Sequence, residues 1–140
     1  MVGLPGSGKS TWLAQKGIGA ISSDEIRGLL ADDPTDQTIH GRVFATVRYL
    51  IRQRLAIGRP ETYVDATNLT RKDRRQFIVI AKAWRCEIDA VFFDVPLEVC
   101  IARNRQRPRQ VPEEALRLLA SKLQPPTLEE GFANIQIVRE

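Results

Sequence analysis

The feature that most constrains this sequence is a glycine-rich loop close to its first residue. Residues 3–10 read G-L-P-G-S-G-K-S and match the pattern G-x-x-x-x-G-K-[ST] at Gly3, Gly8, Lys9 and Ser10. Glycines let the backbone curl so that successive N–H groups point at one phosphate. A lysine at this place reaches the β and γ oxygens, and the serine hydroxyl binds Mg²⁺. The pattern predicts a nucleotide-binding loop, and the alternative is a glycine-rich loop with a chance lysine.

Short apolar stretches alternate with helical patterns through the rest of the chain. We expect helices near residues 9–15, 24–30, 37–57, 70–85, from 96 onward and 113–123, and strands near 20–22, 62–66, 88–95 and 134–138. Strands that alternate with helices imply a parallel sheet covered on both faces. The predicted fold class is therefore α/β, with three layers around a central parallel sheet.

The strand that should precede the glycine-rich loop is almost missing. Such a strand needs about five apolar residues, and only Met1 and Val2 stand before Gly3. We therefore expect a truncated first strand and leave open an upstream extension of the natural protein.

Size and composition indicate one domain spanning residues 1–140. The formal net charge of +4 is compatible with a polyanionic partner but does not require one. No apolar run is long enough to predict a membrane helix, and no leader pattern opens the chain. We therefore expect no membrane partner. Cys86 and Cys100 lie in hydrophobic stretches, which predicts two reduced core residues in a cytoplasmic protein.

Two carboxylates follow predicted strands. Asp24, in S-S-D-E-I-R, could orient an acceptor hydroxyl and take its proton. The alternative is structural, because Ser22 and Glu25 have capping-box spacing and Asp24 suits a first helical turn. Asp65 opens D-A-T-N at a strand's carboxyl end, where ligands bind in parallel sheets.

Other polar and aromatic residues have ordinary structural explanations. Arginines alternate at 103, 105, 107 and 109, which by itself is typical of a solvated basic face. The same reading is preferred for Lys72, Arg74 and Arg75, with phosphate contact as the minority view. Trp12 and Trp84 are expected in the core, and His40 is expected to be a surface or satisfied core residue.

Several segments together resemble a known family. Besides G-L-P-G-S-G-K-S-T, they are S-S-D-E-I-R-G-L, D-D-P-T-D-Q-T, D-A-T-N, R-N-R-Q-R-P-R-Q-V and P-T-L-E-E-G-F. The chain resembles the kinase domain of polynucleotide 5′-hydroxyl kinases of bacterial and animal end-healing enzymes. These belong to a broader set of small P-loop kinases that includes zeta-toxin-like proteins. The resemblance covers nearly the whole chain.

The resemblance implies ATP-dependent phosphoryl transfer to the 5′-hydroxyl of DNA or RNA, with ATP and Mg²⁺ as cofactors. It implies Asp24 as the general base, and an arginine-bearing lid at about 103–112. The implied ATP-binding residues are Gly3, Pro5, Gly6, Ser7, Gly8, Lys9, Ser10, Thr11, Arg103 and Arg107, with Mg²⁺ on Ser10. The implied acceptor-binding residues are Asp24, Arg27, Asp65 and Asn68, and the implied catalytic residues are Lys9, Asp24, Arg103 and Arg107.

Several alternatives remain open at this point. The acceptor could be a small-molecule hydroxyl on a nucleoside, sugar or nucleotide-sugar. The chain could also be a nucleotide-dependent binding module or a slow ATPase. Arg109 competes with Arg107 as the second lid arginine, and the oligomeric state is not predicted.

Overall fold

The computed structural model describes residues 1–139, which form two compact units. Unit 1 comprises Met1–Trp12 and residues 67–139, and unit 2 comprises Leu13–Ala66. The first helix, α1 (Lys9–Gln15), begins in unit 1 and ends in unit 2. The remaining elements are β1 (Ile21–Ser22), α2 (Ser23–Ala31), α3 (His40–Ala56), β2 (Val64–Asp65), α4 (Arg71–Ala83), β3 (Asp89–Phe93), α5 (Leu97–Arg105), α6 (Glu113–Lys122), the 3₁₀ helix η1 (Leu128–Glu130) and β4 (Asn134–Val138).

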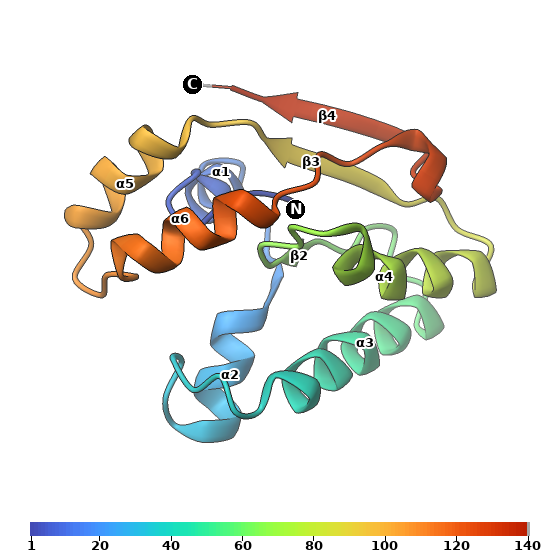
Figure 1. Cartoon of the computed structure of the whole chain (residues 1–140). Helices are drawn as coiled ribbons and strands as arrows, with labels where there is room; N and C mark the ends of the chain where they lie inside the picture. Colours follow the sequence, from blue (N-terminus) through green and yellow to red (C-terminus); the bar gives the residue numbers. More distant parts are fainter. Residues whose placement is uncertain (140) are drawn as a thin grey trace. The chain divides into compact units, whose positions relative to one another are not determined.

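Unit 1 is built on two parallel strands that lie side by side, β3 and β4 (Figure 1). Their register runs from Asp89 opposite Asn134 to Phe93 opposite Val138. On the other side of β3, Val2 forms a single parallel bridge with Phe92. The truncated first strand is therefore confirmed, since the residues before the loop supply one bridge rather than a full strand. Within residues 1–139, the named strands form two parallel pairs, β3 with β4 in unit 1 and β1 with β2 in unit 2.

The strand β3 is buried on both faces, as its continuous apolar sequence predicts. Ala90 and Phe92 pack on one face with Ile78 of α4. Phe93 points to the opposite face and packs in the cluster that contains Cys100 of α5. Successive side chains of a strand alternate between faces, so this one strand joins two hydrophobic clusters.

A buried ion pair ties α4 to η1 in unit 1. Arg74 Nε and Nη2 donate to the two carboxylate oxygens of Glu130 at 2.8 and 3.0 Å, and both side chains are almost completely buried. Arg74 Nη1 also donates to the carbonyl oxygens of Asn68 and Leu69. The prediction of a solvated Arg74 is wrong, because a distant carboxylate and two carbonyls satisfy its guanidinium inside the protein.

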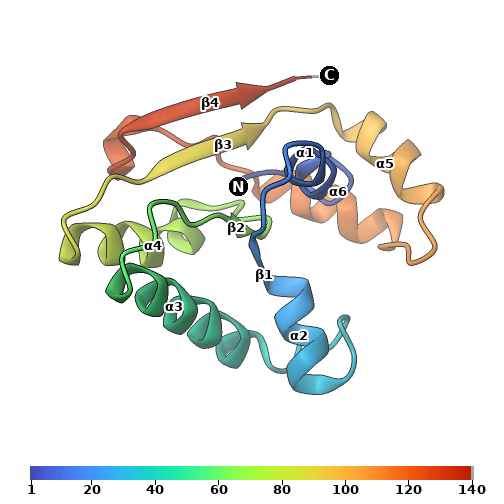
Figure 2. The same cartoon turned by 180° about the vertical axis from the view of Figure 1, so that it is seen from behind.

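Unit 2 places α2 and α3 beside the short parallel pair β1 and β2 (Figure 2). Ile21 lies opposite Val64 and Ser22 lies opposite Asp65. α3 buries Val43, Val47 and Ile51, which recur at helical spacing. The helix begins at His40 rather than near residue 37, because Thr38 and Asp36 form a local turn that precedes it.

Other local predictions have mixed outcomes. Thr70 is confirmed as the N-cap of α4, in a capping box with Asp73. Trp12 is confirmed as a packing residue, in an edge-to-face contact with Phe93. The core assignments of Trp84 and Cys86 are wrong, since both are exposed. They lie at and beyond the C-terminal end of α4, where the chain leaves the helix's buried face. Within residues 1–139, no helix has the length and apolar character needed to cross a membrane.

Candidate active site

The glycine-rich loop of unit 1 needs glycine at specific positions. Gly6 has a φ of +81°, and a Cβ there would lie 2.9 Å from the carbonyl oxygen of Cys100. A Cβ on Gly3 would lie 2.7 Å from Ser7 Oγ and 3.0 Å from the Cβ of Phe93. Side chains at Gly3 and Gly6 would therefore force the loop away from β3 and α5, on which it rests.

The side chain of Lys9, at the end of the loop, bonds back to the first residues of the loop. Its Nζ donates to the carbonyl oxygens of Gly3 and Leu4, each at 2.9 Å, and the side chain is buried. The ammonium is thus held against the loop that the sequence predicts to bind phosphate. Ser7 is also buried, and within residues 1–139 its hydroxyl has no hydrogen-bond partner. A buried hydroxyl without a partner is costly, so this loop is arranged for polar contacts beyond those it makes internally.

Ser10 fits the role of an Mg²⁺ ligand. It is an exposed residue in the first turn of α1, next to Lys9. No cluster of three His, Cys, Asp or Glu side chains suited to a metal ion occurs within residues 1–139. Mg²⁺ at phosphate sites is usually held by one or two side chains together with the substrate phosphates, and a single hydroxyl beside the loop agrees with that arrangement.

The structure brings one of the predicted lid arginines to the loop. Arg103, in the last turn of α5, donates from Nη1 to the carbonyl oxygen of Gly6 at 3.2 Å. Arg107 and Arg109 lie beyond the end of α5 and are exposed. The three arginines therefore differ in position, and only Arg103 has a described contact with the loop within residues 1–139.

Asn104 is a site residue that sequence reasoning missed. It is buried, its Nδ2 donates to the carbonyl oxygen of Val111 at 2.6 Å, and its Oδ1 accepts from the Val111 N–H at 2.9 Å. These two bonds hold together the ends of the arginine-bearing segment. The sequence feature that could have identified Asn104 is an amide residue directly after Arg103, on the buried side of the same helical turn.

Glu113, in the first turn of α6, forms ion pairs with two arginines near this segment. Arg105 and Arg117 both contact Glu113, at 3.2 and 3.1 Å. Hydrogen bonds from Arg105 and then Arg117 lower the pKa of Glu113 below its usual value. The pairs are solvent-exposed, so each contributes little to stability. The Arg105–Glu113 pair joins the last turn of α5 to the first turn of α6.

Replacing Arg103 with alanine should lower kcat by roughly 100-fold and change the KM for ATP much less. In the lid role that the resemblance implies, the guanidinium would stabilise charge that develops on a transferring phosphoryl group, an interaction made mainly in the transition state. The measurement is steady-state kinetics of Arg103→Ala and Arg107→Ala, with Arg85→Ala as an exposed control. Kinetics unchanged in both lid variants would mean that the arginine segment is only a solvated face.

Unit 2 gathers three of the predicted acceptor residues at the carboxyl ends of its strands. Ser22 pairs in register with Asp65, and Ser23 Oγ donates to the carbonyl oxygen of Asp65 at 3.5 Å. Asp24 and Arg27 follow in the first turns of α2. The arrangement places Asp24, Arg27 and Asp65 at one end of the β1–β2 pair, as expected for ligand-binding residues in a parallel sheet.

The capping function of α2 belongs to Ser22. Its side chain accepts from the backbone N–H of Glu25 at 3.2 Å. Asp24 is the second residue of α2, and its side chain is 63% exposed. The helix start therefore does not need the Asp24 carboxylate as a cap, although a favourable interaction with the helix dipole remains.

Arg27 is buried although it carries a charge. Its Nη1 lies 3.5 Å from Asp24 Oδ1, and its Nη2 lies 3.4 Å from Nδ1 of His40. Its Nε is buried and has no hydrogen-bond partner within residues 1–139. A buried guanidinium with an unsatisfied donor is costly, which distinguishes Arg27 from the exposed arginines of the chain. His40 is exposed, in agreement with the expectation of a surface residue, and it also contacts the ring of Phe44. Its contact with Arg27 is what sequence reasoning missed.

Asn68 has a structural role in unit 1. It adopts a φ of +48°, is buried, and donates from Nδ2 to the carbonyl oxygen of Met1 at 2.9 Å. It therefore fixes the short segment before the loop. The acceptor-binding role that the resemblance implies for Asn68 stays a prediction.

Comparisons with known proteins agree with this architecture. A family model described as AAA domain matches residues 1–126. The L-seryl-tRNA(Sec) kinase of Homo sapiens is 32% identical over 77 residues, which cover 54% of this chain and 22% of that protein. The bifunctional polynucleotide phosphatase/kinase of Schizosaccharomyces pombe is 26% identical over 147 residues, which cover 99% of this chain and 32% of that protein. The chain thus spans about a third or less of the length of these curated relatives.

A solved structure shares the fold. The crystal structure of a gluconokinase from Sinorhizobium meliloti 1021 matches with a TM-score of 0.63 and 22% sequence identity, covering 99% of this chain and 79% of that one. The glycine-rich loop, the parallel strands and the helices between them are the parts expected of this fold. The chain belongs to the AAA domain family and has the α/β fold of the small P-loop kinases.

Proposed function

We propose that this protein transfers the γ-phosphoryl group of ATP to the 5′-hydroxyl end of a polynucleotide. The observation that carries the proposal is the pair formed by exposed Asp24 and buried Arg27, 3.5 Å apart on the first turns of α2. Membership among the P-loop kinases supports the reaction type. The acceptor is supported by the match to a polynucleotide phosphatase/kinase over 99% of this chain.

A 5′-terminal nucleoside suits this pair chemically. Its sugar carries a hydroxyl to be phosphorylated and a neighbouring phosphodiester with a negative charge. Asp24 can accept the proton of the hydroxyl as it attacks, and Arg27 can hold the phosphodiester. The unsatisfied Nε of Arg27 supports such a role, since an anionic acceptor would supply the missing hydrogen-bond acceptor.

The ATP side of the proposal rests on unit 1. The loop N–H groups and Lys9 would hold the phosphates, and Arg103 would neutralise charge on the transferring group. Mg²⁺ at Ser10 would supply additional charge neutralisation across the phosphates when bound. We also propose that both units act as one catalytic domain, with a lid at about 103–112. A cytoplasmic location stays a prediction.

A second candidate acceptor is a small anionic polyol or another small-molecule hydroxyl. The gluconokinase with the same fold covers 99% of this chain, which favours this reading. A hydroxy acid could also present a hydroxyl to Asp24 and a negative charge to Arg27. The two candidates differ in the size of the acceptor, and that difference is measurable.

Transfer of label from γ-labelled ATP should appear on a 5′-hydroxyl oligonucleotide, and should not appear on gluconate, nucleosides or nucleotide-sugars. A 5′-phosphorylated oligonucleotide of the same sequence is the matched negative acceptor. Label on a metabolite instead would establish the second candidate. Release of phosphate to water with every acceptor would identify a slow ATPase.

Lys9→Ala should reduce this transfer by roughly 10²–10³-fold, the usual loss when one preorganised charge-stabilising donor is removed. Lys16→Ala is the control, because Lys16 is exposed just beyond the end of α1. The check is single-turnover kinetics at saturating ATP, with thermal unfolding to verify folding. Wild-type turnover in a folded Lys9→Ala protein would remove the nucleotide assignment of the loop.

A further inference from the structure

The described part of the chain buries two arginines, and their partners differ in kind. Arg74 donates to both carboxylate oxygens of Glu130, and that carboxylate is buried with it. Arg27 is 4% exposed, its Nη1 lies 3.5 Å from the exposed carboxylate of Asp24, and its Nη2 lies 3.4 Å from Nδ1 of His40. One guanidinium is therefore neutralised inside the protein, whereas the other has an imidazole as a neighbour.

The contact between Arg27 and His40 has only one possible direction. A guanidinium carries five N–H donors and no hydrogen-bond acceptor, and it keeps its charge in proteins. Nη2 of Arg27 therefore donates and Nδ1 of His40 accepts, which requires an imidazole whose proton is on Nε2 alone. A ring in this state is uncharged, so His40 contacts the guanidinium without neutralising it.

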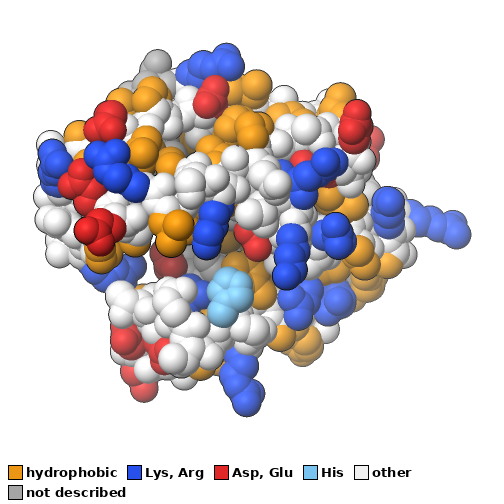
Figure 3. Space-filling view, viewed as in Figure 1, with side chains coloured by type: hydrophobic (Ala, Val, Ile, Leu, Met, Phe, Trp, Pro, Cys, Tyr) orange, Lys and Arg blue, Asp and Glu red, His pale blue; other side chains and the backbone are white. Residues whose placement is uncertain are grey.

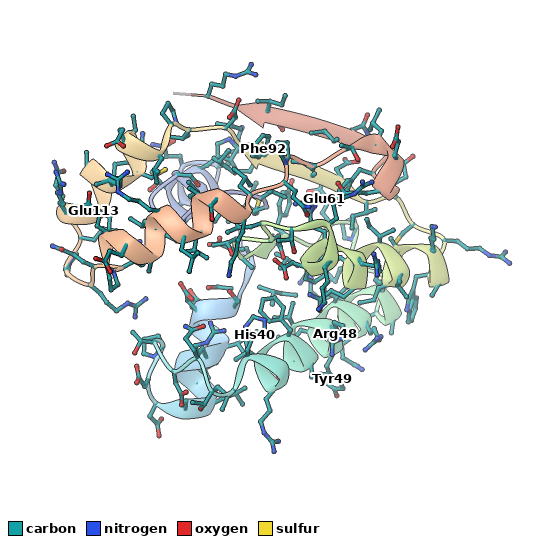
Figure 4. The ribbon with its side chains drawn as sticks, viewed as in Figure 1. His40, Arg48, Tyr49, Glu61, Phe92 and Glu113 are labelled. Atoms are coloured by element: carbon teal, nitrogen blue, oxygen red, sulfur yellow. The ribbon has the colours of Figure 1, made fainter. Side chains whose placement is uncertain are left out.

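The position of His40 on α3 directs its ring toward α2. α3 buries Val43, Val47 and Ile51, and at 100° per residue His40 lies within about 60° of each of them. His40 is the first residue of α3, and it lies beside α2 (Figure 4). Unlike the three buried residues it is exposed, and its pale-blue side chain lies at the surface in Figure 3. Its ring also contacts Phe44, one turn farther along the same helix.

An uncharged partner suits the role that the proposed function gives to Arg27. A buried carboxylate such as Glu130 holds a guanidinium firmly, but it also neutralises the charge that would attract an anionic phosphoryl acceptor. Asp24 cannot give constant support, because in the proposed reaction it takes a proton and loses its negative charge. Nδ1 of His40 needs no change of charge during that step, so it can hold the guanidinium throughout.

We propose that His40 is a positioning residue, whose uncharged Nδ1 holds the buried Arg27 guanidinium where the anionic group of the phosphoryl acceptor binds. His40 acts through Arg27 and does not need to touch the phosphoryl acceptor itself. The inference rests on the proposed function, because that function assigns the anionic group to Arg27. It holds equally for a phosphodiester and for a small hydroxy acid.

Substitutions at position 40 separate the hydrogen bond from the ring. The measurement is the KM and kcat for a 5′-hydroxyl thymidine dinucleotide at saturating ATP. His40→Phe keeps a ring beside Phe44 but has no hydrogen-bond acceptor, and it should raise the KM about 10-fold, as expected for one hydrogen bond to a charged group, with a smaller change in kcat. His40→Asn places an amide oxygen where Nδ1 lies and should nearly restore the wild-type KM.

His40→Asp is the matched partner of His40→Asn, since it has the same shape and adds a negative charge. It should raise the KM again, because a carboxylate beside Arg27 neutralises the guanidinium. Thermal unfolding checks that each variant folds. A KM that is normal in His40→Phe and raised in His40→Asn would overturn the inference, because it would follow the ring rather than the hydrogen bond.

A double-mutant cycle tests whether His40 acts through Arg27. In an Arg27→Lys background, His40→Phe should have almost no further effect on the KM, because the guanidinium that Nδ1 holds is gone. An equal effect of His40→Phe in both backgrounds would contradict a positioning role.

The identity of the phosphoryl acceptor can be tested separately from the role of His40. Transfer to gluconate and not to the dinucleotide would overturn the proposed reaction. The same variants would then be measured with gluconate, whose carboxylate also needs Arg27, and the same order of KM values would uphold His40. Transfer to the dinucleotide with one KM for all variants would overturn the role of His40 alone.

Nuclear magnetic resonance tests the contact without any phosphoryl acceptor. His40 is the only histidine of the chain, so its ring nitrogen signals are unambiguous. At pH 8, above the ordinary titration range of histidine, the Nδ1 signal should shift in Arg27→Lys. It should stay in place in Arg59→Gln, which removes an exposed charge elsewhere in unit 2. An Nδ1 signal that is the same in wild type and Arg27→Lys would overturn the inference, whatever the protein phosphorylates.

Discussion

The Asp24→Asn protein should fold and bind ATP normally but turn over about 10²–10⁴-fold more slowly, the usual contribution of a positioned base. Asparagine keeps the shape of the side chain and removes its ability to accept a proton. The N-cap of α2 is Ser22, so the helix start should survive. The loss of dipole interaction should cost about 0.3–1 kcal/mol or less at this exposed position. The measurements are kcat and thermal unfolding.

Glu25→Gln is the matched control for Asp24→Asn. It removes the same charge from the same turn of α2, at an exposed neighbouring residue. Normal transfer by a folded Asp24→Asn protein would leave Asp24 with only its helix-start role. Arg27→Lys should fold and raise the KM for the oligonucleotide, because an ammonium cannot reproduce the guanidinium's contacts. The salt dependence of that KM should change little, because the positive charge is kept.

The largest effect on stability is expected from breaking the buried Arg74–Glu130 pair. Glu130→Ala should cost about 3–5 kcal/mol, because it leaves the Arg74 guanidinium buried without its carboxylate. The measurement is urea unfolding, in which the midpoint should fall. Glu129→Ala is the control, since Glu129 is the exposed neighbour in the same 3₁₀ helix. A similar midpoint in both variants would show that the pair contributes little.

The same pair predicts a pH dependence. Burial raises the pKa of Glu130, but hydrogen bonds from Arg74 and the Thr127 N–H outweigh burial and leave the pKa below its ordinary value of 4.5. A carboxyl group with a lowered folded pKa stabilises the protein above its unfolded pKa, and this stabilisation is lost as pH falls through the folded pKa. Stability should therefore decline below about pH 4.5, and Glu130→Gln should flatten that decline.

Much of the local structure was encoded in short segments. The loop pattern, the cap at Thr70 and the strand Asn134–Val138 are confirmed as predicted. Each depends on chemistry within a few residues: glycines that permit positive φ, a side chain that accepts from a nearby N–H, or alternating apolar residues. The same holds for the truncated first strand, which follows from the two residues before Gly3.

The site could be predicted only in part. The pattern at Gly3–Ser10 located the loop, but four alternating arginines could not indicate which one contacts it. Arg103 reaches Gly6 because α5 packs its Cys100 against the loop backbone. Asn104 escaped notice, and the contact between His40 and Arg27 could not be predicted, because the partners of Asn104 and His40 are set by how the chain folds back on itself.

The sequence by itself determined the phosphate loop, the alternation of strands and helices, and hence the P-loop fold. The tertiary structure decided which charges are buried and paired. Arg74 has the local sequence of a solvated helix face, and its partner Glu130 lies 56 residues away. No local pattern encodes such a pair, because its free energy depends on desolvation and on a geometry that exists only once α4 and η1 have met.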